Sequence, residues 1–289
     1  MATKITTRKL ELFAVHVVAN GTAGPYLPFF QYIERLAVKD RITSFGERLF
    51  AFEVFRQIGS NIFELRVIEG PLSQELLIFN YEDGVARTEG LDTGEVVAHR
   101  THAILDIARR RIAIEYVRSG AKAHHIASLM EDIAAKSDEP KFREMIVSLT
   151  TIPNESFLRE IAEFERVRTI ELGLAMPNAG FGDHFPNLLG ELIETTGGAA
   201  GDVEIRAPRG KSLRKRGGLM TILRNIVQDA HPYLQKAIVR GFKRNSEAED
   251  AASLKRQNVN KRVRFEVNDA GAVRSDEVSR QLSQFIAEN

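Results

Sequence analysis

The amino-acid sequence predicts an α+β fold, in which an N-terminal antiparallel meander with helices is followed by a small α/β sandwich with a basic C-terminal extension. Three observations lead to this class. Short runs of apolar and β-branched residues end at Gly, Asn or Pro, as strands do. Other segments repeat apolar residues every three or four positions, as amphipathic helices do. Hydrophobic residues make up 43% of the 289 residues, which is enough to build a buried core.

The first 139 residues are expected to form one domain, a meander covered by helices. The strand at 10–20 is rich in apolar and β-branched residues and ends at Asn20-Gly21, a dipeptide typical of turns. Further strands are expected at 49–55, 62–68, 76–81, 95–105 and 111–117. Helices are expected at 27–39 and 121–136, where one apolar stripe recurs at helical spacing.

The polar stretch at 137–140 predicts a domain boundary, so the second domain is expected to span residues 140–289. Strands are expected at 142–151, 167–176, 202–207, 233–241 and 263–267. Helices are expected at 155–163, 188–193, 219–227 and near the C-terminus, with a helical or disordered link at 247–254. The alternation of strands and helices is compatible with a ferredoxin-like sandwich but does not fix the strand pairing.

Charge is concentrated between Arg206 and Arg264. This segment holds 16 Lys and Arg against four Asp and Glu, which gives it a net charge of +12. The remaining residues hold 24 Lys and Arg against 35 Asp and Glu, so the net charge of the whole chain is only +1. Such asymmetry indicates a polyanionic partner.

The loop at 209–218 carries the strongest signal for binding. It combines cations with glycines at 210, 217 and 218, which predicts a flexible cationic loop able to follow a phosphate chain. No aromatic residue lies between Arg206 and Arg224, which favours recognition of the nucleic-acid backbone over base stacking. The predicted nucleic-acid-binding residues are Arg209, Lys211, Arg214, Lys215 and Arg216, supported by Lys243, Arg244, Lys255 and Arg256. The alternatives are a solvated surface loop and a patch that docks on an acidic protein surface.

Familiar catalytic signatures are missing. Residues 210–212 resemble the end of a Walker A loop, but Ile205 stands where that loop needs a glycine. Asp183-His184 follows a glycine-rich loop and is compatible with acid–base chemistry, although Asp183 is more simply a helix cap. The histidines are expected at the surface or partly buried rather than on a metal. We therefore predict no catalytic residue, no metal site and no cofactor, and keep a nuclease-type enzyme as a further alternative.

Composition also bounds the compartment. The chain has no cysteine, which fits a reducing environment. The first ten residues lack the pattern of a secretion signal, and the longest apolar runs are shorter than a bilayer crossing needs. A cytoplasmic protein without a membrane span is expected.

The element order and two short motifs resemble RexA-like phage exclusion proteins and uncharacterised bacterial proteins encoded beside anti-phage defence systems. The motifs are residues 102–106 leading to Tyr116, and residues 164–167 leading to 176–178. The resemblance implies a sensor or adaptor of phage defence for which DNA is a better candidate ligand than RNA and which is able to form a homodimer. It transfers no site residues. The alternative in this context is a subunit of a defence complex that docks through its basic face on a protein encoded nearby.

Overall fold

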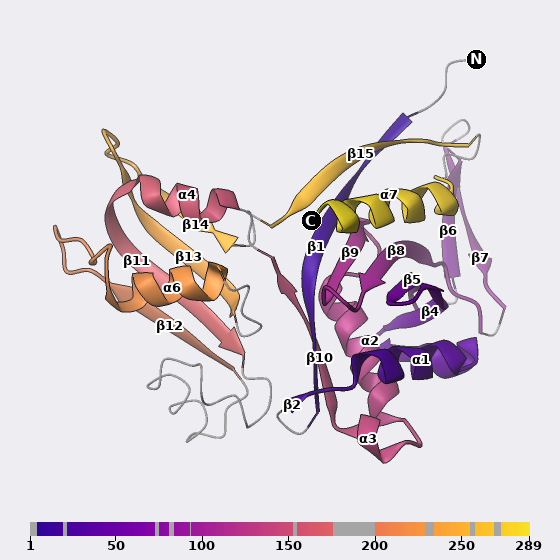
Figure 1. Cartoon of the computed structure of the whole chain (residues 1–289). Coiled ribbons are helices and arrows are strands. Elements are labelled where there is room, and N and C mark those ends of the chain that lie inside the picture. The colour runs from indigo at the N-terminus through magenta and orange to yellow at the C-terminus, as the bar shows by residue number, and fades with distance from the viewer. Residues whose placement is uncertain are drawn as a thin grey trace.

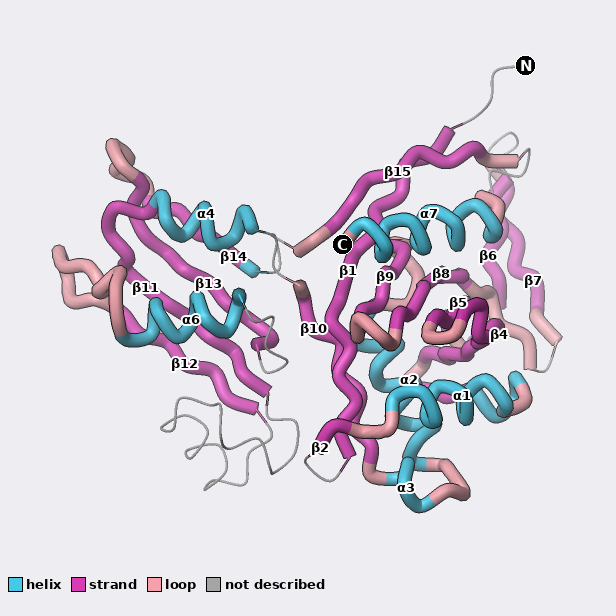
Figure 2. The backbone as a smooth tube through the Cα atoms, in the orientation of Figure 1, coloured by secondary structure: helices cyan, strands magenta, loops and turns pink. Residues whose placement is uncertain are grey.

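The computed structural model describes residues 5–19, 22–72, 75–80, 84–92, 94–152, 155–175, 200–228, 234–254, 258–268 and 273–289. These residues form an α+β fold with two main antiparallel sheets, so the predicted class is confirmed (Figure 1, Figure 2). The expected helix at 188–193 lies outside the described residues.

Within the described residues, the large sheet has nine strands in the order β10-β1-β9-β8-β5-β4-β3, with β2 and β15 also paired to β1. The strands are β1 (Ile5–Ala19), β2 (Thr22–Ala23), β3 (Ile42–Phe45), β4 (Arg48–Gly59), β5 (Ile62–Pro71), β8 (His99–Asp106), β9 (Arg111–Tyr116), β10 (Met145–Thr151) and β15 (Asn260–Glu266). A separate hairpin joins β6 (Glu75–Asn80) to β7 (Val85–Gly90). The 15-residue strand β1 organises the large sheet, because it pairs with β9 along one edge and with β15 and β10, end to end, along the other.

Helices cover both faces of the large sheet (Figure 1). The helices are α1 (Tyr26–Arg35), α2 (Ala123–Ala135) and the short α3 (Pro140–Arg143) on one face and α7 (Ser275–Glu288) on the other, with a 3-10 turn at Val38–Arg41. The alternation along β9 explains the two layers: Ile112 and Ile114 belong to the core under α1 and α2, whereas Ala113 belongs to the core under α7. The strand is therefore apolar on both faces.

Phenylalanine rings fill the core under α1. Phe29 and Phe30 lie with their ring centroids 5.3 Å apart, and Phe30 lies 6.1 Å from Phe63 on β5. All three side chains are fully buried. Burial of each such ring stabilises the fold by about 1.5–3 kcal/mol relative to exposure. The many phenylalanines of the sequence are thus mainly core residues, as their lack of polar atoms suggests.

The second sheet belongs to a smaller unit that we call the small unit (residues 155–254). Its elements are α4 (Glu155–Glu163), β11 (Phe164–Ala175), β12 (Ala200–Arg206), α6 (Gly218–Gln228), β13 (Leu234–Lys243) and β14 (Glu249–Ser253). The strand order is β12-β11-β13-β14, and α4 and α6 pack on one face (Figure 1). Among the described strands of this unit every pair is antiparallel, and none forms the parallel pair that the βαβ units of a ferredoxin-like sheet contain.

The small unit is an insertion in the edge of the large sheet. The Val259 amide donates to the Ile152 carbonyl at 3.1 Å, and the Leu12 amide donates to the Val259 carbonyl at 3.0 Å. The chain therefore leaves the large sheet at the end of β10 and returns beside that point at the start of β15 (Figure 2). The strands expected at 142–151 and 263–267 both join the large sheet, so the expected boundary at residues 139 and 140 does not coincide with the division between the sheets.

In the part of the chain that the structure describes, no helix combines the length and the apolar character that a bilayer crossing requires.

Candidate nucleic-acid interface

The basic segment between Arg206 and Arg264 does not form one continuous surface. Its loop at 208–217 and its strands β13 and β14 belong to the small unit, whereas Arg262 and Arg264 lie on β15 in the large sheet. The net charge of +12 is therefore divided between two places. The loop at 208–217, which we call the cationic loop, keeps the highest density of positive charge.

The first part and the centre of the cationic loop are attached to β11. The Val167 amide donates to the Ser212 hydroxyl at 3.0 Å, and the Leu213 amide donates to the Val167 carbonyl at 2.8 Å. Leu213 is half-buried and packs on the core of the small unit. The loop was expected to be flexible, but its backbone is anchored to the sheet, because Leu213 at its centre pairs with Val167 of β11.

Arg168 on β11 holds the start of the loop. Its guanidinium donates to the carbonyls of Pro208 at 2.7 Å and Lys211 at 2.8 Å. Gly210 and Gly217 have φ of 76° and 78°, a region where a side chain is strained, so glycine suits both turns. These contacts fix the backbone from which the loop cations extend.

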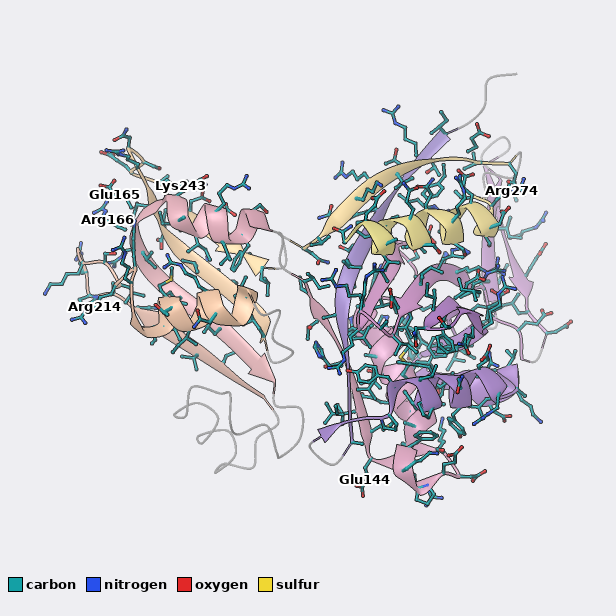
Figure 3. The ribbon with its side chains drawn as sticks, in the orientation of Figure 1. Glu144, Glu165, Arg166, Arg214, Lys243 and Arg274 are labelled. Atoms are coloured by element: carbon teal, nitrogen blue, oxygen red, sulfur yellow. The ribbon has the colours of Figure 1, made fainter. Side chains whose placement is uncertain are left out.

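The loop cations are available to a partner. Arg209, Lys211, Arg214 and Arg216 are exposed and Lys215 is half-buried. Among the described residues, none of the five makes an ion pair with a carboxylate; the nearest ion pair along the chain joins Arg206 to Glu204. The structure thus brings the five predicted loop residues together on one short loop. In Figure 3, Arg214 lies at the end of the small unit that is far from the large sheet.

Lys243 does not belong to this surface. Its ammonium lies 3.0 Å from Asp250, 3.3 Å from Glu163 and 3.7 Å from Glu160, so three carboxylates surround it. The hydrogen bond with Asp250, aided by Glu163, raises the pKa of Lys243 above its ordinary value. The support of phosphate binding by Lys243 stays a prediction, but its charge is offset by these three carboxylates, so Lys243 is a poorer phosphate ligand than the loop cations.

Of the other predicted supporting residues, only Arg244 can be placed. It is exposed and directly follows β13. Gly241, Val167 and Leu213 lie side by side across the sheet, because Val167 pairs with both of the others. Arg244 comes three residues after Gly241, so at about 3.3 Å per residue it lies about 10 Å along the strand direction from Leu213 of the cationic loop. Lys255 and Arg256 lie outside the described residues, as does the Asp183-His184 pair.

The sheet face opposite α4 and α6 is balanced in charge. Glu171 lies 3.2 Å from both Lys236 and Arg240, and Arg206 pairs with Glu204 at 2.6 Å. Burial raises the pKa of Glu171, but hydrogen bonds from Lys236 and Arg240 outweigh it and leave the pKa below its ordinary value. The open sheet face is therefore a poorer polyanion surface than the cationic loop.

Sequence reasoning missed two arginines beside the loop. Arg168 holds the loop backbone, and Arg166 is exposed with its guanidinium 4.7 Å from the centre of the Phe242 ring (Figure 3). Both flank Val167 in the Arg-Val-Arg sequence near the start of β11. Because Val167 is apolar and buried, the alternation of the sequence could have predicted that the two arginines point to the opposite face of the strand. Only the pairing of Val167 with Leu213 shows that this run lies beside the loop.

A second polar cluster joins α7 to the large sheet. His102 Nδ1 lies 2.7 Å from the carboxylate of Glu115, and His102 Nε2 lies 2.9 Å from the Ser275 hydroxyl. The carboxylate only accepts, so Nδ1 carries a proton, and in the neutral ring Nε2 accepts from Ser275. His102 is 4% exposed, deeper than the expected surface or partial burial.

The order hydroxyl, imidazole and carboxylate in this cluster is that of a nucleophilic triad. Two observations favour a structural role. First, Glu115 also forms an ion pair with Arg8. Second, Ser279, which lies one helical turn after Ser275 on α7, makes a similar contact to the sheet by donating to the Glu64 carboxylate at 2.8 Å. Ser275 and Ser279 thus attach the same face of α7 to the sheet. Among the described residues, no three His, Asp or Glu side chains gather closely enough to hold a metal ion.

Comparison with protein-family models gives no match, and comparison with curated proteins gives none either. The function therefore has to be inferred from the geometry of the chain itself.

Proposed function

We propose that this protein binds the phosphate backbone of nucleic acid through the cationic loop, as a sensor or adaptor in bacterial phage defence. The observation that carries the proposal is the set of five loop cations that pair with no described carboxylate while the loop backbone is held on β11. The resemblance to RexA-like proteins favours DNA over RNA, a homodimer and the defence role.

The physical basis is the release of counterions. A duplex carries a dense row of phosphates, and each Lys or Arg that neutralises one phosphate releases a condensed cation. A held loop loses less conformational entropy on binding than a mobile one, so its charges are used more efficiently. The loop has no aromatic residue, so we expect contacts to phosphates without base readout.

The test is the affinity for a short DNA duplex and for RNA of equal length, measured by fluorescence anisotropy at two or more salt concentrations. In one variant Arg214, Lys215 and Arg216 are all changed to Glu. We expect the wild type to lose affinity as salt rises, and the variant to bind more weakly with a slope in log–log form that is shallower by roughly three.

The matched control reverses three exposed cations on other elements, namely Lys39, Arg87 and Arg280. It changes the net charge equally, so a general effect of charge would weaken both variants alike. Equal loss in the two variants, or no DNA affinity of the wild type at low salt, would refute the proposal.

The docking alternative has its own outcome in the same experiment. If the cationic loop serves an acidic protein, the wild type shows no salt-dependent affinity for DNA or RNA. It then co-purifies with a neighbouring gene product, and the Glu variant of the loop loses that partner.

A further inference from the structure

A cleft of about 640 Å³ lies on the large sheet where the small unit is inserted. It opens on the face that α2 covers only in part, beside the ends of β10 and β15. Its lining residues are Lys9, Glu11, Phe13, Ile114, Glu115, Tyr116, Ala121, Lys122, Ala123, His124, Thr151 and Asn258. None of them belongs to the cationic loop.

Strand register extends this cleft into a row of side chains across three strands. Lys9 on β1 pairs with Arg262 on β15 and with Tyr116 on β9. Directly opposite residues of antiparallel strands share a face of the sheet, so Arg262, Lys9 and Tyr116 stand side by side at the mouth of the cleft. Arg262 is exposed and makes no ion pair with a described carboxylate.

One wall of the cleft suits a flat ring. Phe13 and Ile114 are apolar, and Tyr116, two residues beyond Ile114 on the same face of β9, is 44% exposed. The Lys122 ammonium lies 4.3 Å from the centre of the Tyr116 ring. This cation–π contact orients the exposed ring, although the ring does not pack into the hydrophobic core.

The other groups of the cleft favour an anion. Lys9 is held by Glu11 at 2.6 Å, and Lys122 donates to the carbonyls of Val117 and Arg118. Among the described lining residues the carboxylates are Glu11 and Glu115, and Glu115 points to the α7 side, so Lys9, Lys122 and Arg262 outnumber the carboxylate of Glu11 there. The 13-residue helix α2 begins at Ala123 in the wall, so the positive end of its dipole adds to the field.

Asn258 supplies a buried polar group to the cleft. It lines the cleft, is 4% exposed, and its Oδ1 has no hydrogen-bond partner among the residues that the structure describes. Buried polar atoms of this kind are rare in folded proteins and call for an explanation. An amide offers both donors and an acceptor, the groups that read the edge of a heterocycle.

We propose that this cleft binds a mononucleotide, with the phosphate against Lys9 and Arg262 and the base against Tyr116. The volume is that of a pocket for one small ligand. It holds a ring wall, a cationic mouth and an amide, which are the three parts that a nucleoside monophosphate requires. The inference is independent of the cationic loop, because the two sites share no residue.

The experiment is isothermal titration calorimetry of the full chain with AMP, GMP, CMP and UMP, and with adenosine as the probe without phosphate. We expect at least one nucleotide to bind and adenosine to bind about tenfold more weakly than AMP or not at all. Arg262→Ala and Tyr116→Ala should each weaken the nucleotide at least about tenfold. Both side chains are exposed, so both variants should fold, which unfolding curves in urea verify.

Arg216→Ala on the cationic loop is the matched control and should bind the nucleotide as the wild type does. The proposal is overturned if no nucleotide binds at about 1 mM, or if its affinity is the same in Arg262→Ala and Tyr116→Ala. It is also overturned if these two variants lose affinity for DNA and keep that for nucleotide, because the cleft would then be part of the polynucleotide surface. If the variants of the cationic loop do not weaken DNA binding, the proposed function is refuted but the proposal of a nucleotide site in the cleft is not affected.

Discussion

Glu115 connects three elements through one buried carboxylate. The residue lies on β9, is 0% exposed, and accepts hydrogen bonds from Arg8 on β1 and from His102 on β8. His102 continues the connection to Ser275 on α7. Burial raises the pKa of Glu115, but the bonds from His102 and Arg8 outweigh burial and hold the pKa below its ordinary value. The ionised carboxylate is thus the form that the fold requires.

Glu115→Gln should destabilise the protein by about 1.5–3 kcal/mol at neutral pH, because it removes the charged partner of the half-buried Arg8 and of His102. A carboxyl whose folded pKa is lowered stabilises the fold above its unfolded pKa, and this contribution disappears as the pH falls through the folded pKa. The difference in the free energy of unfolding between wild type and variant should therefore shrink on acidification below about pH 4. Urea unfolding at several pH values measures it.

The control for this substitution is Glu89→Gln on β7, where the carboxylate pairs with Arg87 at 3.0 Å and both side chains are more than half exposed. An exposed pair contributes at most about 1 kcal/mol. Similar costs for the two variants would contradict the central role of Glu115.

The pairing of His102 with Glu115 also shows a limit of sequence reasoning at the scale of single residues. The sequence places both on strands, but only the register of β8 with β9 makes them neighbours. The histidine was therefore expected nearer the surface than it lies.

At the scale of elements, the small unit depends on a close approach of β13 to β11. Register shifts occur in β11 between Phe164 and Arg166 and between Val167 and Thr169, opposite Gly241. A Cβ atom on Gly241 would lie 2.2 Å from the Arg166 carbonyl oxygen, a backbone atom that cannot move without the strand. The bulges and Gly241 together place Arg166 beside Phe242, one residue before Val167, which pairs with the cationic loop.

Gly241→Ala should destabilise the small unit by at least about 1–3 kcal/mol, because the added methyl group overlaps the β11 backbone. Gly59→Ala on β4 is the control: its nearest neighbour is an Ile62 side-chain atom at 3.6 Å, an ordinary contact. Thermal unfolding compares the two variants. A melting temperature of Gly241→Ala equal to that of Gly59→Ala would contradict the close approach.

The segment 247–254 shows why one element was predicted wrongly. Its Ala and Glu residues favour a helix or a polar link, but residues 249–253 form β14. Ala252 pairs with Val239 and is fully buried on the core of the small unit. Pairing with the edge of β13 overrides the local propensity, which is common in strands.

At the scale of the whole molecule, the small unit is attached through two adjacent points of one sheet edge. The 3.1 Å hydrogen bond between Val259 and Ile152 joins the ends of the inserted chain. The cores of the two units consist of separate sets of buried residues. An insertion of this kind can be removed with little change to the parent sheet.

Replacement of residues 155–256 by a short Gly-Ser linker should therefore leave the large sheet folded and abolish DNA binding. Circular dichroism and cooperative urea unfolding measure the fold, and anisotropy measures the DNA affinity. A product that does not fold would contradict the independence of the large sheet. DNA affinity that persists would contradict the assignment of binding to the cationic loop.

The sequence by itself determined the α+β class, the position of most strands and helices, and the cationic loop with its five cations. These features are local: strand alternation, helical spacing, turn residues and charge density are all properties of neighbouring residues. Terminal strand β15 and helix α7 were also foreseen as elements, though not as parts of the large sheet.

The tertiary structure alone decided which strands meet. It placed β10 and β15 end to end on β1, surrounded Lys243 with carboxylates, laid the cationic loop along β11, and brought Lys9, Tyr116 and Arg262 to one cleft. The physical reason is that strand pairing joins residues far apart in the chain through backbone hydrogen bonds, which every sequence can make. The choice of partner therefore depends on the burial of whole faces rather than on any local pattern.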